Sequence, residues 1–367
     1  MIIGQCRLPH DPRDLFGANA HSYSEVLLQP ATPDEVALLA EVSRVLAADS
    51  TVVGTAQRIM AGLMSDNWIV EELHGTRIEL FVYRRAKRAA LDDVQKSSEL
   101  LLFLDAEGVP VPAPLPTPEM QTYVVEHEGA LWQRFPFVHG MYYRGSDVEL
   151  EVAARGIARM HLALAKYPHV SSFPQKAYGS IDVREWDAAM DVLKGSDVAR
   201  HVEILQLREK ALRAHAEVES LRQSGSLSEQ VIHTDLHPQN FLFQDERLNA
   251  IIDFGNASWG VLSVDIGMAC HRLVRQHVVF CDRSPAVAIP DAVQSFLDAY
   301  CSINPSYGPM IGQLPLFMRE LLLRKVGDVL LGHAAGRRIE VEAITEITKF
   351  GSLIDEVDMI ETLGFAK

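Results

Sequence analysis

The stretch VIHTDLHPQNFLF, residues 231–243, places two histidines, an aspartate and an asparagine between apolar residues. Three interpretations compete for His233, Asp235 and His237. Alternating residues of an extended chain share one face, so these three side chains could bind a metal ion together. They could also belong to an ordinary turn around Pro238 that is capped by polar side chains. The third interpretation depends on the residues that follow.

A second polar cluster lies downstream at a defined spacing. Asn240 follows Asp235 by five residues, and Asp253-Phe254-Gly255 lies within NAIIDFGNASWG. This H-x-D-x-x-x-x-N and D-F-G arrangement is that of the catalytic and metal-binding loops of kinases. Apolar residues flank the polar segment Asp245-Glu246-Arg247 on both sides, which predicts a β-hairpin that brings Asn240 and Asp253 together.

The chemistry of phosphoryl transfer explains why these residue types are needed. A carboxylate accepts the proton of the attacking hydroxyl, and oxygen ligands hold Mg²⁺ against the nucleotide phosphates. The spacing therefore predicts Asp235 as the catalytic base, with Asn240 and Asp253 as the metal ligands. A zinc site at the two histidines would need a fourth ligand nearby, and the sequence offers no obvious one.

The motifs HTDLHPQNFLF and IIDFGNA resemble the core of the aminoglycoside phosphotransferase, choline kinase and type II homoserine kinase superfamily. The resemblance extends from about Thr55 to about Tyr300. It implies an α+β, two-lobed protein-kinase-like fold that uses ATP and Mg²⁺, with a small-molecule hydroxyl compound as the phosphate acceptor. It also implies that His233, His237 and Asp265 brace the catalytic loop.

Composition limits the class of protein. A chain of 367 residues with 48% hydrophobic residues can bury one large core or two ordinary ones. It contains no long uncharged apolar run, and charges come early at its N-terminus, so we expect a cytoplasmic protein without a membrane segment. The net charge of -15 argues against nucleic acid as a partner and weakly favours an amine-bearing acceptor. The oligomeric state is not readable from the sequence.

Residue patterns divide the chain into three predicted parts. Residues 1–50 form an N-terminal extension with an accessory helix that Thr32 caps. Residues 51–135 form the N-lobe, with three antiparallel strands, a helix at 90–106 and two strands joined at Glu128-Gly129. Residues 136–367 form a mainly helical C-lobe that carries the catalytic loop, the metal loop and the acceptor site.

The family resemblance also suggests nucleotide-binding residues. WQRFPFVHG would be the hinge between the lobes, with Arg134, Phe135 and Phe137 beside the adenine. The loop that covers the nucleotide would lie near residues 61–67 and would contribute Gly62 and Asn67.

Two departures from the family pattern concern charge and backbone. Thr234 stands where the family commonly has glycine. In an ungapped alignment, Phe81 takes the place of the phosphate-binding lysine or arginine of the third strand. Arg84 or Arg85 could supply that charge. However, Arg84 lies on the opposite face of a regular strand from Phe81, so a bulge or a shifted register would be needed.

The glutamate that pairs with this cation is also unsettled in the sequence. Glu99 is the candidate on the helix at 90–106, although the ungapped alignment favours Ser97 or Ser98. The strand cation and the helix glutamate are expected to be present or absent together, because either one alone would be an unpaired charge.

Three functional hypotheses follow from these patterns. The first is an ATP-dependent kinase of a small hydroxylated metabolite or an aminoglycoside-like compound. The second is a degenerate member of the superfamily that binds nucleotide or ligand without efficient phosphoryl transfer, as Phe81 suggests. The third is a metal-dependent hydrolase that uses His233 and His237. The intact set of Asp235, Asn240 and Asp253 favours the kinase.

Overall fold

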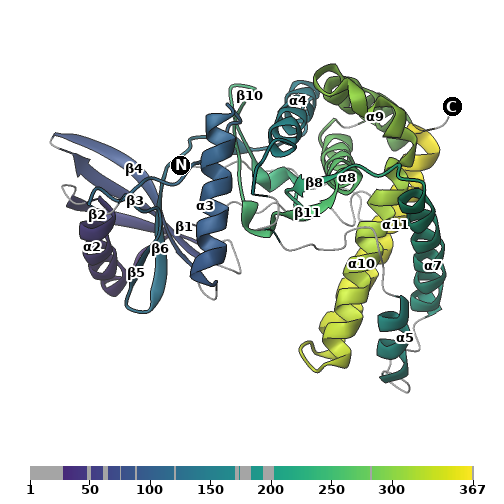
Figure 1. The fold of residues 1–367 in the computed structure, drawn as a ribbon, viewed down its shortest axis with the longest axis horizontal. Coiled ribbons are helices and arrows are strands. Elements are labelled where there is room, and N and C mark those ends of the chain that lie inside the picture. The colour runs from purple at the N-terminus through teal and green to yellow at the C-terminus, as the bar shows by residue number, and fades with distance from the viewer. Residues whose placement is uncertain are drawn as a thin grey trace. The chain divides into compact units, whose positions relative to one another are not determined.

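The computed structural model describes residues 28–47, 51–60, 65–74, 76–86, 89–119, 121–169, 173, 183–192, 202–281 and 283–365. These residues form two compact units, whose elements are traced in Figure 1. Unit 1 contains the described residues of Tyr23–Tyr143 together with Gln239–Gly255. Unit 2 contains those of Arg144–Pro238 and Asn256–Lys367.

Unit 1 is built on a six-stranded antiparallel sheet. The strand order is β1 (Leu28–Pro30), β2 (Thr51–Ile59), β3 (Ser65–His74), β4 (Arg77–Ala86), β6 (Ala130–Pro136) and β5 (Val125–His127). Glu128 and Gly129 join β5 to β6 with φ of 52° and 72°, the left-handed backbone that a two-residue hairpin turn requires. The predicted strands and this turn are confirmed.

One face of the sheet packs against α2 (Pro33–Ala47). Thr32 caps this helix: its hydroxyl accepts the N–H of Glu35 at 3.2 Å, and the Glu35 carboxylate accepts the N–H of Thr32 at 2.9 Å. The shared apolar core consists of Leu39, Val42, Leu46, Ala56, Trp68, Val70, Phe81, Tyr83, Val125 and Trp132. The predicted cap is therefore confirmed, but the helix belongs to the core of unit 1.

The opposite face of the sheet carries α3 (Leu91–Ala106), seen beside the strands in Figure 1. The Gln133 amide of β6 donates a hydrogen bond to the Ser98 hydroxyl of α3 at 2.8 Å, and both side chains are buried. Neighbouring residues of a strand point to opposite faces, so Gln133 lies on the α3 face while Trp132 lies on the α2 face.

The hairpin around the metal loop is part of unit 1. Strands β9 (Phe241–Gln244) and β10 (Arg247–Ile251) pair, and β9 also pairs with β7 (Met141–Tyr142). The Ile251 N–H donates to the Pro110 carbonyl at 2.8 Å, which ties the hairpin to the segment after α3. The expected assignment of all residues beyond 136 to one helical lobe therefore differs from this arrangement. The difference arises because the hairpin pairs with segments that are distant in the sequence, and local residue patterns do not predict such pairing.

Unit 2 is mainly helical. Its helices are α4 (Asp147–Leu164), α5 (Val183–Val192), α7 (Val202–Gln223), α8 (Leu262–Phe280), α9 (Pro285–Ile303), α10 (Leu314–Ala334) and α11 (Glu340–Gly364). A two-stranded sheet of β8 (Glu229–Ile232) and β11 (Ser258–Val261) leads directly into α8. A capping box at Ser146 begins α4, since its hydroxyl accepts the Glu149 N–H at 3.1 Å and the Glu149 carboxylate accepts the Ser146 N–H.

The predicted fold class is confirmed, with a small antiparallel sheet that carries one internal helix and a larger, mainly helical part. Among the described residues, no helix combines the length and the apolar character needed to cross a membrane.

A buried charged network connects three strands on the α2 face of the sheet. Glu72 is fully buried, and its carboxylate accepts hydrogen bonds from Arg134 at 2.8 and 2.7 Å and from the Tyr83 hydroxyl at 2.8 Å. His74 Nε2 lies 2.9 Å from the same carboxylate. The Arg134 guanidinium carbon lies 3.8 Å from the centre of the Phe81 ring. These contacts give Arg134 a structural role within the sheet.

We expect Arg134→Met to destabilise the protein by about 3 to 5 kcal/mol, because it leaves the Glu72 carboxylate buried without its cation. Adding Glu72→Gln should recover part of that loss, since the buried charge is then absent. Urea unfolding of the full chain measures both effects. Arg85→Met is the matched control: its partner Asp66 is 2.7 Å away at a more exposed site, so the loss should stay near about 1 kcal/mol. Equal losses in the two single variants would contradict the prediction.

Candidate active site

The loop that follows β8 is held by one buried carboxylate. Asp265, in the first turn of α8, accepts the backbone N–H of His233 at 2.7 Å and that of Thr234 at 2.6 Å. His161 Nε2 contacts the same carboxylate at 3.2 Å, and His161 Nδ1 contacts the Tyr300 hydroxyl at 2.9 Å. All these side chains except that of Thr234 are almost completely buried. The bracing role expected of Asp265 is confirmed.

The backbone explains why glycine is common at position 234 in the resembling family. Thr234 has a φ of 71°, in the left-handed region that is unfavourable for a β-branched residue. Besides its N–H bond to Asp265, its hydroxyl donates to the Asn256 carbonyl at 2.9 Å. The loop therefore keeps the backbone that glycine would adopt, and two hydrogen bonds stabilise it.

Asp235 occupies the middle of the loop with a quarter of its side chain exposed. His237 Nε2 lies 3.6 Å from its carboxylate. Burial alone would raise the pKa of Asp235, but His237, Lys325 and His233 outweigh it and lower the pKa to about 2. Asp235 is therefore an anion throughout the physiological pH range, in a position to accept a hydrogen bond from a ligand hydroxyl.

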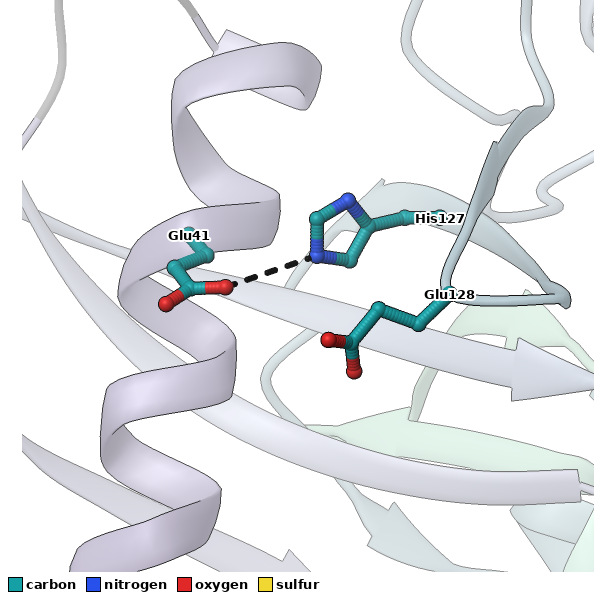
Figure 2. Close-up of side chains that lie close together, drawn as sticks. All are labelled: Glu41, His127 and Glu128. Carbon is teal, nitrogen blue, oxygen red and sulfur yellow. Dashed lines mark ion pairs between the residues drawn. The ribbon is translucent and has the colours of Figure 1, made fainter.

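The described residues do not place further metal-ligand atoms around the two histidines of the loop. His233 is fully buried, and its Nδ1 accepts the N–H of Asp235 at 3.3 Å, which is a bracing contact. Within the described part of the chain, metal-ligand atoms of three residues gather only at Glu41, His127 and Glu128. That group lies at the surface of unit 1, where His127 and Glu41 are 3.7 Å apart (Figure 2). A closed zinc site needs a fourth ligand, so the hydrolase hypothesis is not supported.

The hairpin of unit 1 places the predicted metal ligands at its two ends. Asn240 directly precedes β9, and Asp253 follows β10 by two residues. The Ile252 N–H donates to the Asn240 carbonyl at 2.9 Å, so the two backbone segments are adjacent. Asn240 is buried, whereas Asp253 is exposed and has a φ of 66°. The predicted hairpin is confirmed, and it offers oxygen ligands of the kind that Mg²⁺ prefers.

Arg84 lies beside Asp253. A Cβ atom placed on Gly255 would be 3.7 Å from Arg84 Nη2 and 3.4 Å from Asp253 Oδ1. The Arg84 Nε is buried and has no hydrogen-bond partner among the described residues. Loss of solvent lowers the pKa of Arg84, and the Asp253 charge partly compensates. This arrangement suits a cation that binds an anionic ligand near the metal loop.

The predicted need for a bulge at Arg84 was wrong. The pairing of β3 with β4 is continuous from Ser65 to His74, so β4 is regular and Arg84 does lie on the face opposite Phe81. However, the Phe81 face packs under α2, whereas the Arg84 face is the one that carries α3 and lies beside Asp253. Arg84 therefore reaches the metal loop without a shift of register. Arg85 points the other way, into its ion pair with Asp66.

Asn67 and Phe135, which were also predicted to bind nucleotide, share the face of Arg84. Asn67 lies directly opposite Arg84 on β3, and Gln133 lies opposite it on β6, so the three side chains form one row across the sheet. Phe135 lies in the next row, opposite Val82.

The remaining predicted residues have different positions. Phe137 follows β6, where its N–H donates to the Leu80 carbonyl at 3.2 Å and its ring packs on His139. The side chain of Arg134 is bound to Glu72 on the α2 face, which does not support a contact with adenine. Gly62 lies outside the described residues.

The helix residue that faces Gln133 is Ser98, and Glu99 is exposed. Glu99 is therefore not the buried partner of a sheet cation, in agreement with the ungapped alignment. Arg84 has Asp253 as its neighbouring carboxylate instead. A cation beside Asp253 thus stands three residues after Phe81 on the same strand.

A model of the phosphotransferase enzyme family matches residues 55–309, which is more than half of the chain. The chain belongs to this family. A homoserine kinase of Brucella anthropi is 25% identical over 269 residues, covering 72% of this chain and 76% of that protein. A homoserine kinase of Rhodopseudomonas palustris is 26% identical over 276 residues, with the same coverage of both chains.

Solved structures of small-molecule kinases share the fold. The amicoumacin kinase hAmiN, in complex with AMP-PNP, Ca²⁺ and its ligand, has a TM-score of 0.62 at 14% identity and covers 89% of this chain and 95% of its own. A microcompartment-associated aminopropanol kinase has a TM-score of 0.58 at 15% identity, with coverage of 91% and 99%. The predicted superfamily, fold and enzyme class, a small-molecule phosphotransferase, are therefore confirmed.

Sequence reasoning missed Lys325 of α10, whose charge acts on Asp235. The signal was available, because Lys325 interrupts the apolar run ELLLRKVGDVLLG. Leu321, Leu322 and Val329, which lie one turn away along the helix, are all buried. A lysine at such a position faces the protein interior rather than the outer surface.

We expect Thr234→Ala to destabilise the protein by about 1 kcal/mol, because it removes the hydrogen bond to Asn256 and keeps the left-handed strain. Thr234→Gly also loses that bond but relieves the strain. Its loss of stability should therefore be smaller, although glycine makes the unfolded chain more flexible. Urea unfolding of wild type and the two variants gives the order of their stabilities. An alanine variant at least as stable as the glycine variant would contradict this account.

Proposed function

We propose that this protein transfers the γ-phosphate of ATP, with Mg²⁺, to a hydroxyl group of a small metabolite, and that Asp235 is the catalytic base. The observation that carries the proposal is the adjacency of Arg84 and Asp253 on unit 1. A buried arginine nitrogen that has no hydrogen-bond partner among the described residues, beside an exposed carboxylate, suits a ligand with both phosphate oxygens and a divalent cation.

The roles follow from the chemistry of each group. Arg84 would bind phosphate oxygens, while Asn240 and Asp253 would hold the metal ion through oxygen atoms. Bound Mg²⁺ would neutralise charge on the phosphates. The rings of Phe135 and Phe137, with Asn67 in the row of Arg84, would contact the rest of the nucleotide.

Asp235 would act on the acceptor. Its carboxylate accepts a hydrogen bond from the acceptor hydroxyl and orients the oxygen toward the γ-phosphorus. The new bond forms between that oxygen and phosphorus, the bond to the ADP oxygen breaks, and the hydroxyl proton passes to Asp235. A carboxyl group with a low pKa suits a loose transition state, in which the proton leaves late and orientation matters most.

The degenerate alternative rested on Phe81. Because Arg84 supplies a cation on the face of Asp253, the position of Phe81 no longer argues against nucleotide binding. The similarity to homoserine kinases supports an acceptor of the size of an amino acid. This similarity favours a metabolite over an aminoglycoside.

We expect wild type to bind ATP in a Mg²⁺-dependent manner and to form ADP in the presence of hydroxylated amino acids or amino alcohols. Asp253→Ala should abolish the Mg²⁺ dependence of binding in a calorimetric titration, because it removes a metal ligand. Asp235→Asn should keep nucleotide binding and unfolding temperature but lose transfer by about 100-fold or more, the scale of general-base effects. Robust transfer in Asp235→Asn would remove the assignment of the base, and absence of ATP binding in wild type would favour the degenerate alternative.

We expect Arg84→Met to weaken binding of Mg²⁺–ATP by about 30-fold or more, because a desolvated cation loses its contact with phosphate. Parallel calorimetric titrations with ATP, ADP and adenosine should show weaker binding of ATP and ADP by the variant and unchanged binding of adenosine. Arg85→Met removes the same charge from the next residue, on the α2 face, and should leave all three affinities unchanged. Equal affinities of the Arg84 and Arg85 variants for ATP would exclude the proposed role.

A further inference from the structure

A second group of possible metal ligands lies on unit 1, outside the residues proposed to bind the nucleotide. The carboxylates of Glu41 and Glu128 and the imidazole of His127 converge, so that their ligand atoms lie within 4.8 Å of one another (Figure 2). Glu41 belongs to α2, and the other two residues end β5 and begin the turn to β6. The group therefore lies at the α2 face of the sheet, whereas Arg84 lies on the opposite face beside Asp253.

The apolar core of unit 1 fixes the backbone that carries these side chains. Leu39 and Val42 of α2 pack in one core with Val125 of β5, and Ala130 of β6 packs against the same core. His127 follows Val125 by two residues, so its side chain points to the same face of the strand. The helix and the turn are thus held next to one another by buried contacts that do not involve the polar group itself.

The turn explains why Glu128 shares the group with its neighbour His127. Adjacent residues of a regular strand point to opposite faces, but Glu128 has a φ of 52° and breaks that alternation. Its carboxylate is directed to the same side as the imidazole of His127, as Figure 2 shows. The helix therefore contributes one ligand atom and the turn contributes two.

The Nε2 atom of His127 gives a separate indication of a bound ion. This atom is shielded from solvent, although a quarter of the whole side chain is exposed, and it has no hydrogen-bond partner among the described residues. Glu41 Oε2 lies 3.7 Å away, which is too far for a hydrogen bond. In a tetrahedral zinc site the nitrogen and oxygen ligands lie about 3.4 Å apart, because each bond to zinc is roughly 2.0–2.2 Å long. The separation of the two atoms thus suits two ligands of one ion.

The charges of the group also favour a cation. Glu41 and Glu128 bring two carboxylates together, and within the described part of the chain neither forms an ion pair with a lysine or an arginine. Carboxylates that share a site repel one another unless a cation lies between them. Half of the Glu41 side chain is exposed, so an ion can enter from solvent. A mixed set of imidazole and carboxylates suits Zn²⁺ and related ions, whereas Mg²⁺ and Ca²⁺ prefer oxygen ligands alone.

We propose that Glu41, His127 and Glu128 bind a divalent transition-metal ion of the zinc class, with water as the remaining ligand. Three protein ligands and one water make an open four-coordinate site. The ion connects α2 to the turn between β5 and β6, two segments that are distant in the sequence. The site does not depend on the proposed kinase function, because none of its residues is assigned to the nucleotide or the acceptor.

The test is a calorimetric titration of Zn²⁺ into the full-length protein after removal of metal ions with a chelator and dialysis. Excess Mg²⁺ is present throughout, so that it competes with Zn²⁺ at the proposed ligands Asn240 and Asp253. His127→Gln and Glu41→Gln each remove one zinc ligand, and Glu41→His replaces a carboxylate by another zinc ligand. Glu126→Gln is the matched control: it removes an exposed carboxylate from the residue before His127, on the opposite face of the strand.

Wild type and Glu126→Gln should bind Zn²⁺ with equal affinity at their tightest site. His127→Gln and Glu41→Gln should weaken that binding by about 10- to 100-fold or more, since even the loss of a residue that only contacts a ligand has effects of this size. Glu41→His should retain the affinity, because imidazole also binds zinc. Zn²⁺ should raise the unfolding temperature of wild type and Glu126→Gln and leave that of His127→Gln unchanged, because only a site in the folded state links binding to stability.

Two results would overturn the inference. One is the absence of Zn²⁺ binding by wild type in the micromolar range, which would leave Glu41 and His127 as an ordinary surface ion pair. The other is equal affinity of wild type and His127→Gln, which would place the bound zinc at other side chains. Should His127→Gln unfold at a lower temperature than wild type without metal, the comparison of Glu41→Gln with Glu41→His decides, because both variants remove the same charge.

Discussion

The carboxylate of Asp265 makes the contacts on which the loop that carries Asp235 depends. A fully buried anion is unfavourable unless donors surround it, and here two backbone N–H groups and His161 provide them. The same bonds impose the left-handed backbone on Thr234 and place Asp235 between buried neighbours. One interaction thus connects α8 to the loop and fixes the backbone that carries Asp235.

The chemistry of the proposed reaction is divided between the two units. Unit 1 holds the groups that are proposed to bind phosphate and metal, on one face of its sheet and at the ends of its hairpin. Unit 2 holds the groups that would act on the acceptor. Sequence order hides this division, because Asp235 and Asn240 are five residues apart but belong to different units. Acceptor specificity can therefore change through helices of unit 2 without altering the nucleotide site.

The sequence predicted the fold class, the strands, the capped helices and the core motif, because these depend on local periodicity and on fixed spacings. Predictions that depended on orientation were less successful. Arg84 and Phe81 were compared by alignment, yet their roles depend on which helix covers which face of the sheet, and that is a property of the whole unit. Arg134 was assigned to the nucleotide from the hinge motif, but Glu72, 62 residues away, binds its side chain. Lys325, whose charge acts on Asp235, comes from the distant helix α10 and belongs to no motif.

The discontinuous make-up of unit 1 has a consequence for biosynthesis. The chain passes from one unit to the other between Tyr143 and Arg144, between Pro238 and Gln239, and between Gly255 and Asn256. Strand β7 therefore leaves the ribosome roughly 100 residues before β9, a delay of about 5 to 20 s at ordinary rates of translation. During that interval the sheet can form from its six sequential strands, but the segment that carries Asn240 and Asp253 does not yet exist. The nascent chain can thus form the sheet that carries Arg84 first, whereas the proposed metal ligands are synthesised only after several helices of the other unit.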